Sequence, residues 1–260
     1  MARWHRSGIA ALLAATLLGA GLTAAAASAG TGIGTNGDGD FLDLTVAVSP
    51  PVASTAKVPQ GVGLEISDFL GNRVNADSAV PMTSLDMFFR QGFTENGVLF
   101  PACTINTTTI SRCPAASQIG SGSAETERLN PGGEVPTFGR ASLRVYNGQP
   151  YLYGGSTLIF VFSRGGRGLA ELDFAVHPQQ GGLAINQILL PGAGPGTGIT
   201  RFDVSIPDRQ ERLRVKGKTT TVHFFTAPTA CTGGWTFGET TTSSGRRPLR
   251  ASATQTCVTK

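Results

Sequence analysis

The strongest constraint on the fold of this chain is an alternation of apolar and polar residues with a period of two. In residues 41–48, the side chains of Leu42, Leu44, Val46 and Val48 fall on one face of an extended segment. A period of two is typical of a β-strand with one buried face. The same alternation recurs in residues 62–66, 85–89, 141–146, 170–176 and 201–206. Residues 157–162 are apolar on both faces and predict a central strand.

The composition argues against long helices. The 260 residues include 35 Gly and 15 Pro, the two residue types with the lowest helix propensity. Turn-forming pairs such as Asn147-Gly148, Gly165-Gly166 and Gly181-Gly182 separate the predicted strands. We therefore expect an all-β fold, an antiparallel β-sandwich of the immunoglobulin-like or jelly-roll kind.

The domain organisation follows from the same pattern. We expect residues 41–260 to form a single β-sandwich domain, preceded by a flexible N-terminal extension at residues 30–40. The Gly- and Pro-rich tract at residues 191–198 is interpreted as a long loop. The alternative, a division into two domains at this tract, would leave a small C-terminal unit.

The first 29 residues have the organisation of a secretion signal. Arg3, His5 and Arg6 precede an apolar run over residues 9–22, and Ala27-Ser28-Ala29 forms an A-x-A cleavage site. We expect cleavage before Gly30 and a protein that is secreted or retained in the cell envelope of a bacterium. A membrane anchor is the alternative, but small residues rather than a stop-transfer pattern follow the apolar run.

The charge balance disfavours nucleic acid as a partner. Without Arg3 and Arg6 the chain has 19 Lys and Arg against 17 Asp and Glu, a net charge of +2. The basic cluster in residues 209–218 is interrupted by Glu211, and we interpret it as a solvated strand or loop. A cell-envelope component or a glycan are the candidate partners, and their identity stays open.

Four cysteines predict two disulfides, each local in sequence. Cys231 and Cys257 lie symmetrically about a turn at residues 243–245, which places them near the open end of a β-hairpin. We pair Cys103 with Cys113 and Cys231 with Cys257, although the sequence alone allows three connectivities. The alternatives are reduced cysteines or a metal site, but neither pair has C-x-x-C spacing. We expect no metal and no cofactor.

The cysteine regions resemble a known group of proteins. Phe100-Pro-Ala-Cys103, followed by Cys113-Pro-Ala-Ala-Ser-Gln-Ile-Gly-Ser-Gly, is similar to a block in uncharacterised secreted β-rich proteins of actinobacteria. The C-terminal Cys231-Thr-Gly-Gly-Trp-Thr-Phe237, closing with Cys257, is similar to the ending of the same proteins. The resemblance covers about a quarter of the chain, implies secretion and a β-rich fold, and carries no activity.

The best candidate catalytic residues are Glu171 and Asp173. They fall on the same face of one predicted strand, about 7 Å apart. This E-x-D pattern is similar to that of retaining glycosidases with a jelly-roll fold, such as laminarinases. Those enzymes carry a second Glu, the acid/base, shortly after the pair, where this chain has Ala175 and Val176. The alternative, which we favour, is a polar strand face in contact with solvent.

Other chemical signatures are weak. His177 and His223 are the histidines that follow Gly30, and no G-x-S-x-G nucleophile elbow accompanies them. Asn36, Asp38 and Asp40 alternate as in a calcium loop, but Phe41 replaces the required Gly, so we interpret them as a solvated linker. We therefore expect a structural or binding protein. The alternatives are a carbohydrate-active enzyme using Glu171 and Asp173, and a carrier of a lipid or small molecule.

Overall fold

The computed structural model describes most of the chain after the predicted signal. The described residues are 28–72, 82–104, 113–128, 137–152, 154–165, 167–188, 197–215, 217–243 and 245–259. The predicted signal peptide, apart from Ser28 and Ala29, and most of the tract at residues 191–198 lie outside this part.

Twelve strands of the described residues form one antiparallel sheet. In chain order they are β1 (Gly30–Thr35), β2 (Asp40–Ser49), β3 (Gly63–Asn72), β4 (Met82–Arg90), β6 (Gln118–Arg128), β7 (Thr137–Pro150), β8 (Ser156–Arg164), β9 (Arg167–Gln179), β10 (Gly182–Ile188), β11 (Thr197–Ile206), β15 (Trp235–Ser243) and β16 (Leu249–Gln255). Apart from Val62, which precedes β3, every segment predicted from the alternation lies in one of these strands, so the all-β prediction is confirmed.

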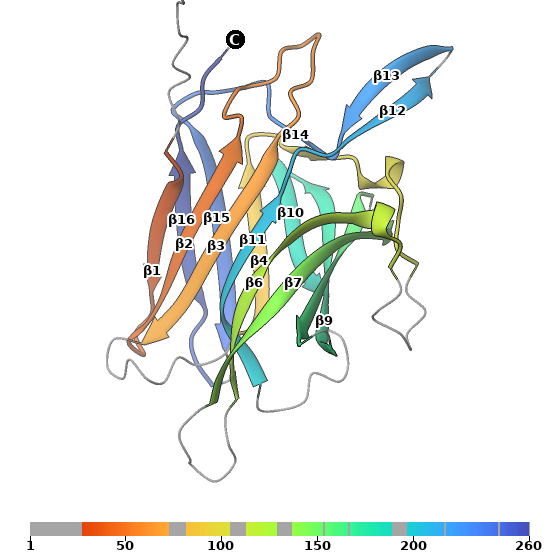
Figure 1. Cartoon of the computed structure of the whole chain (residues 1–260). Coiled ribbons are helices and arrows are strands. Elements are labelled where there is room, and N and C mark those ends of the chain that lie inside the picture. Colours follow the sequence, from red (N-terminus) through yellow and green to blue (C-terminus); the bar gives the residue numbers. More distant parts are fainter. Residues whose placement is uncertain are drawn as a thin grey trace, which may run out of the picture.

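The sheet closes on itself, which corrects the predicted sandwich. Its strand order is β1-β2-β3-β11-β6-β7-β8-β9-β10-β4-β15-β16, and β11 also pairs with β4 at Ile199 and Met82. The seven strands from β11 round to β4 therefore form a closed barrel, with the other five outside it (Figure 1). Alternation shows that a strand has one buried face, but sandwiches and barrels share this property. The prediction of two separate sheets was wrong because the alternation contains no information about strand pairing.

A second correction concerns Asn147 and Gly148. This pair predicts a turn, but it lies within β7, which runs from Thr137 to Pro150. The β7–β8 register shifts between Asn147 and Pro150, so the pair marks an irregularity in the ladder.

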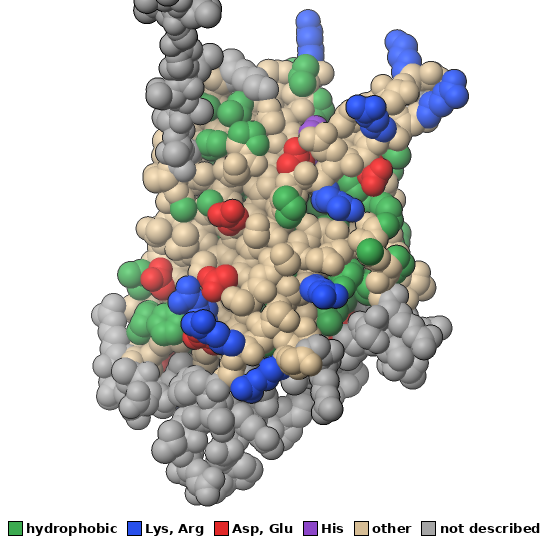
Figure 2. Space-filling model, in the orientation of Figure 1, with side chains coloured by type: hydrophobic (Ala, Val, Ile, Leu, Met, Phe, Trp, Pro, Cys, Tyr) green, Lys and Arg blue, Asp and Glu red, His purple; other side chains and the backbone are tan. Residues whose placement is uncertain are grey.

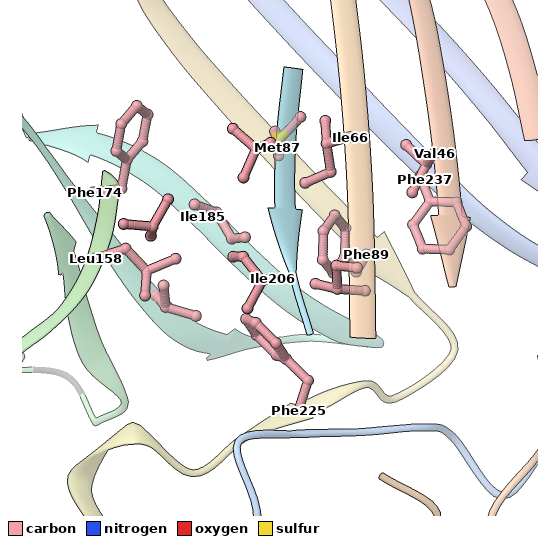
Figure 3. Close-up of a cluster of buried hydrophobic side chains, with 14 of the residues drawn as sticks. Val46, Ile66, Met87, Phe89, Leu158, Phe174, Ile185, Ile206, Phe225 and Phe237 are labelled. Carbon is pink, nitrogen blue, oxygen red and sulfur yellow. The ribbon is translucent and has the colours of Figure 1, made fainter. Parts of the chain in front are cut away.

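The inner faces of the strands share one apolar core. Phe160 of β8 and Phe174 of β9 lie with ring centroids 4.6 Å apart inside the barrel. Phe89 of β4 packs against Phe237 of β15, with ring centroids 5.2 Å apart. Figure 3 shows side chains from β2, β3, β4, β8, β9, β10, β11 and β15 converging on this core. A barrel of this strand number has an interior that side chains fill, and here they are mostly Leu, Val, Ile and Phe.

The predicted N-terminal extension is instead partly strand. Residues 30–35 form β1, which pairs with β2 along its whole length. Gly30, Gly32 and Gly34 face β16 so closely that a methyl group on Gly32 would overlap the carbonyl oxygen of Ser252. The glycines that suggested flexibility are therefore required by close backbone approach.

The predicted linker at residues 36–40 forms the turn between β1 and β2. Asn36 Oδ1 accepts hydrogen bonds from the backbone N–H groups of Asp38 and Asp40 at 2.9 and 3.0 Å. Asp40 is buried and accepts from Asn72 Nδ2 at 2.5 Å. No group of three or more His, Cys, Asp or Glu side chains in the described ranges could hold a metal ion.

Four short elements cover one end of the barrel. They are β5 (Thr94–Glu95), β14 (Phe225–Thr226), and the 3₁₀ turns η1 (Gly97–Leu99) and η2 (Ala115–Ser117). β5 pairs with β14, and Phe224 packs edge-on against Phe100 and Phe225. Just before β14, β12 (Gln210–Val215) and β13 (Lys218–His223) pair only with each other and project from the body (Figure 1). We call this hairpin the arm.

Both predicted disulfides are present. Cys103 and Cys113 have Cα atoms 5.0 Å apart, and Cys231 and Cys257 have Cα atoms 5.8 Å apart. The second bond lies just beyond the last β15–β16 pair, Trp235 with Gln255, as the predicted hairpin requires. The first bond packs on Tyr146, Ile159 and Val161, which explains why β8 is apolar on both faces.

Candidate functional site

Glu171 and Asp173 lie together on the outer face of β9. Their neighbours on β8 are Val161 and Ile159, which belong to the apolar cluster under the first disulfide. Burial raises the pKa of Asp173, and burial followed by the charge of Asp173 raises the pKa of Glu171. Asp173 Oδ1 is buried and has no hydrogen-bond partner among the described residues. Glu171 and Asp173 therefore share one face, as the E-x-D pattern predicts, but both side chains lie half-buried against an apolar surface.

The acids that would complete a glycosidase do not join this pair. Glu239, on β15, points into the core. Glu65 lies on the exposed face of β3, which β11, β6, β7 and β8 separate from β9 in the strand order. Asp86 of β4 shares the outer face, but the β9–β10–β4 register places it two strands away from Ala175. Strand spacing then puts its Cα about 12 Å from that of Asp173. Retaining hydrolysis needs carboxyl groups about 5–5.5 Å apart.

A polar network lies next to the pair on the same face. Asn186 of β10 donates from Nδ2 to Asp86 Oδ1 at 2.9 Å, so its Oδ1 accepts from His177 Nε2, also at 2.9 Å. Tyr151 stacks on the His177 ring, with centroids 6.0 Å apart. In the described residues the hydrogen-bond partners of the His177 ring are the Pro178 carbonyl and Asn186 Oδ1, and neither is a nucleophile.

A second carboxyl pair, which sequence reasoning missed, lies inside the core. Asp68 on β3 and Glu239 on β15 are 0% and 2% exposed. Burial, and then the charge of Glu239, raises the pKa of Asp68, and burial raises the pKa of Glu239 to about 8. Phe202 N–H donates to Asp68 Oδ1 at 2.9 Å. Asp68 Oδ2 and both Glu239 oxygens lack hydrogen-bond partners in the described residues. Burial and the proximity of the two groups therefore favour the protonated form of the carboxyls.

The signal for this pair was available in the sequence. Asp68 occupies an inward position in the alternation of Leu64, Ile66 and Leu70, and Glu239 follows Trp235 and Phe237 at the same spacing. An acid at a core position of a strand predicts a buried, neutralised carboxyl. The pair lies within the core, away from any surface where a ligand could bind, so it affects the stability of the fold.

A third carboxyl, Glu95, fastens the end segment to the barrel. It accepts hydrogen bonds from Ser156 Oγ at 2.7 Å and from the N–H of Gly97, and burial raises its pKa to about 7. Asn147 Nδ2 donates to the Gly97 carbonyl at 2.8 Å. A methyl group on Gly97 would overlap oxygens of Glu95 and Ser156. The cluster therefore closes around the Gly97 backbone rather than around a ligand.

The arm gathers the basic residues that the sequence placed in a solvated strand or loop. Arg212 and Arg214 on β12, and Lys218, Thr219 and Thr221 on β13, are all exposed. Figure 2 shows Lys and Arg side chains along the arm, pointing away from the body. No ion pair in the described residues involves Arg212 or Arg214.

The root of the arm, in contrast, is fixed. His223 Nδ1 lies 2.9 Å from Asp208 Oδ1, and both side chains are mostly buried. Asn96 Nδ2 donates to the His223 carbonyl at 2.8 Å, and Phe224 N–H donates to the Arg209 carbonyl at 2.8 Å. The second histidine therefore has a positioning role at the base of the arm.

Comparison with known proteins identifies no relative of this chain. No family model matches the chain, and neither a curated protein nor a solved structure matches it. In the part of the chain that is described, no helix is long and apolar enough to cross a membrane. The assignment of function therefore rests on the geometry above.

Proposed function

We propose that this protein is a secreted, non-catalytic binding protein of the cell envelope or the surrounding medium, and that the arm is its contact element. The secretion signal at residues 1–29 and the two disulfides support an extracellular location. The observation that carries the proposal is the arm itself, a two-stranded sheet that pairs with no other strand of the body.

An isolated two-stranded hairpin is at best marginally stable in water. Here the side chains of β12 and β13 whose burial is described are mostly exposed, and among them Val222 near the root packs on the core. The barrel gains little from such an extension, whereas a partner lying against it would complete its packing. The fixed root supports this role, because an anchored arm loses less conformational freedom when it binds.

The two alternative functions have weaker support. A carbohydrate-active enzyme is favoured by the raised pKa values of Glu171 and Asp173, but the third carboxylate is missing from the positions described above. A carrier needs space between the strands, whereas aromatic rings such as Phe160 and Phe174 are in contact within the barrel.

The proposal is tested by removing the arm. Gln210 and His223 are cross-strand partners, so replacing residues 211–222 by Asn-Gly gives a two-residue turn that closes the same pair. The protein from Gly30 onward should sediment with cell walls of the producing organism, and the shortened protein should stay in solution. An unchanged thermal midpoint, measured by circular dichroism, would show that the body is intact. Equal sedimentation of both proteins would refute the proposal.

A further inference from the structure

The arm concentrates the positive charge of the protein. Residues 208–223 contain five Lys and Arg and two Asp and Glu, a net charge of +3. The whole chain from Gly30 has a net charge of +2, so all remaining residues together are slightly negative. A barrel with a nearly neutral body and a cationic projection is suited to an anionic partner. Two such arms would repel each other, which disfavours a second copy of this chain as the partner.

One face of the arm carries only hydrogen-bonding side chains. Residues directly opposite in an antiparallel pair share a face, and Arg212 pairs with Thr221 while Arg214 pairs with Thr219. Gln210 and His223 complete this face at the root. These arginines and threonines are exposed. On the opposite face Glu211, Leu213 and Val222 are half-buried, whereas Thr220 and Lys218 near the tip are exposed. We call the outward side the Arg–Thr face.

The Arg–Thr face repeats the same pair twice. Arg212 and Arg214 are two residues apart on one strand, so the two Arg–Thr pairs are separated by about 7 Å. Each pair offers a planar guanidinium fork from β12 and a hydroxyl donor from β13. A phosphate accepts donors from several directions around a tetrahedral centre, whereas carboxylate acceptor positions lie in one plane. The repeated pair therefore matches a polymeric ligand that presents phosphates at regular intervals.

The residues on this face also disfavour folded proteins and nucleic acids as partners. Protein interfaces rely on aromatic and apolar anchors, and the Arg–Thr face has none. Single-stranded nucleic acids stack their bases on exposed aromatic side chains, whereas the one ring on this face, that of His223 at the root, is mostly buried. Binding to a double helix would need a larger basic footprint than two arginines.

We infer that the Arg–Thr face binds an extended polyol-phosphate polymer, a phosphodiester-linked chain without bases, of the kind that an envelope surface can carry. This inference rests on the proposed function, because it names the partner of the arm. Successive phosphates would lie on the Arg212–Thr221 and Arg214–Thr219 pairs, with each arginine donating to non-bridging oxygens and each threonine hydroxyl donating from the neighbouring strand.

The test measures binding of fluorescein-labelled poly(glycerol phosphate) to the protein from Gly30 onward, by fluorescence anisotropy over a range of salt concentrations. R212Q/R214Q should weaken binding by about tenfold and reduce the salt slope by about 1.4, the value for two lost contacts with a single chain. The control R144Q/R250Q removes the same charge from exposed positions on the body and should change affinity by less than about twofold.

A second variant separates recognition from simple charge attraction. T219V/T221V keeps the charge and the β-branched shape but removes both hydroxyls, so affinity should fall about fivefold with an unchanged salt slope. Equal losses in R212Q/R214Q and R144Q/R250Q, or no loss in T219V/T221V, would overturn the inference. Tighter binding of polygalacturonate or of a single-stranded DNA oligonucleotide would also overturn it. If the shortened arm abolishes sedimentation with cell walls while R212Q/R214Q does not, the inference fails and the proposed function stands.

Discussion

Replacing Glu239 by Gln should make the stability of the folded protein less dependent on pH. Asp68 and Glu239 are both buried in the core, where burial opposes the ionisation of either group. Gln is neutral at every pH and nearly isosteric with protonated Glu. Its amide can also donate to Asp68 Oδ2, which has no other partner in the described residues. The variant therefore keeps the contact and removes one titrating group.

The direction of the effect follows from the raised pKa. In the unfolded chain Glu239 ionises near its ordinary value of 4.5, whereas in the folded protein its pKa is about 8. The stability that the neutral carboxyl provides is fully present below about pH 4.5 and is lost as the pH rises towards 8. At 1.36 kcal/mol per pKa unit, the loss across this window is at most about 5 kcal/mol. E239Q should therefore match the wild type at about pH 4.5 and exceed it at about pH 8 by several kcal/mol.

Urea unfolding at a series of pH values measures this difference. Trp235 is 0% exposed and is the one tryptophan after Gly30, so its fluorescence reports the core directly. Glu95 also titrates with a raised pKa, but it is common to both proteins and cancels in the comparison. E65Q, at an exposed position on β3, serves as the control and should behave as the wild type. A stability difference between E239Q and wild type that is constant with pH would refute a protonated carboxyl in the core.

Three further predictions concern other parts of the fold. G32A should detach β1 from β16, because its methyl group would overlap the Ser252 carbonyl oxygen. Backbone hydrogen exchange in β1 should then accelerate, whereas the control T31A, at an exposed position on the same strand, should leave the exchange unchanged. C257S should cost about 2–4 kcal/mol in urea unfolding, since it releases the end of the last strand; a loss below about 1 kcal/mol would contradict this role. The wild type should not hydrolyse a panel of β-glucans, and turnover that disappears in E171Q would instead establish the glycosidase alternative.

The outer-face pair shows how far residue patterns can go in predicting a site. The sequence placed Glu171 and Asp173 on one face of a strand, and the structure places both on the outer face of β9. The sequence could not decide whether a third acid would join them. Asp86, an acid on the same face, comes from β4, and its distance from the pair depends on how β4, β10 and β9 pair.

The arm and the core pair were present in the sequence but were not recognised. The basic residues at 212–218 alternate with uncharged ones, which fits any solvated strand, and nothing local indicates that the hairpin leaves the body. Asp68 and Glu239 each break an apolar alternation, but only their meeting explains how both can be buried. Both features depend on contacts between residues far apart in the chain.

The sequence by itself determined most of the core strands and favoured the two local disulfides. Alternation depends on the burial of each strand's own faces, and the bonds Cys103–Cys113 and Cys231–Cys257 join residues near each other in the chain. The tertiary structure alone decided that β4 meets β11 to close a barrel, that the glycines of β1 pack on β16, and that β12 and β13 project. The physical reason is that every strand edge offers the same backbone hydrogen bonds. Sheet twist and the packing of the whole core, rather than any local signal, select which edges pair.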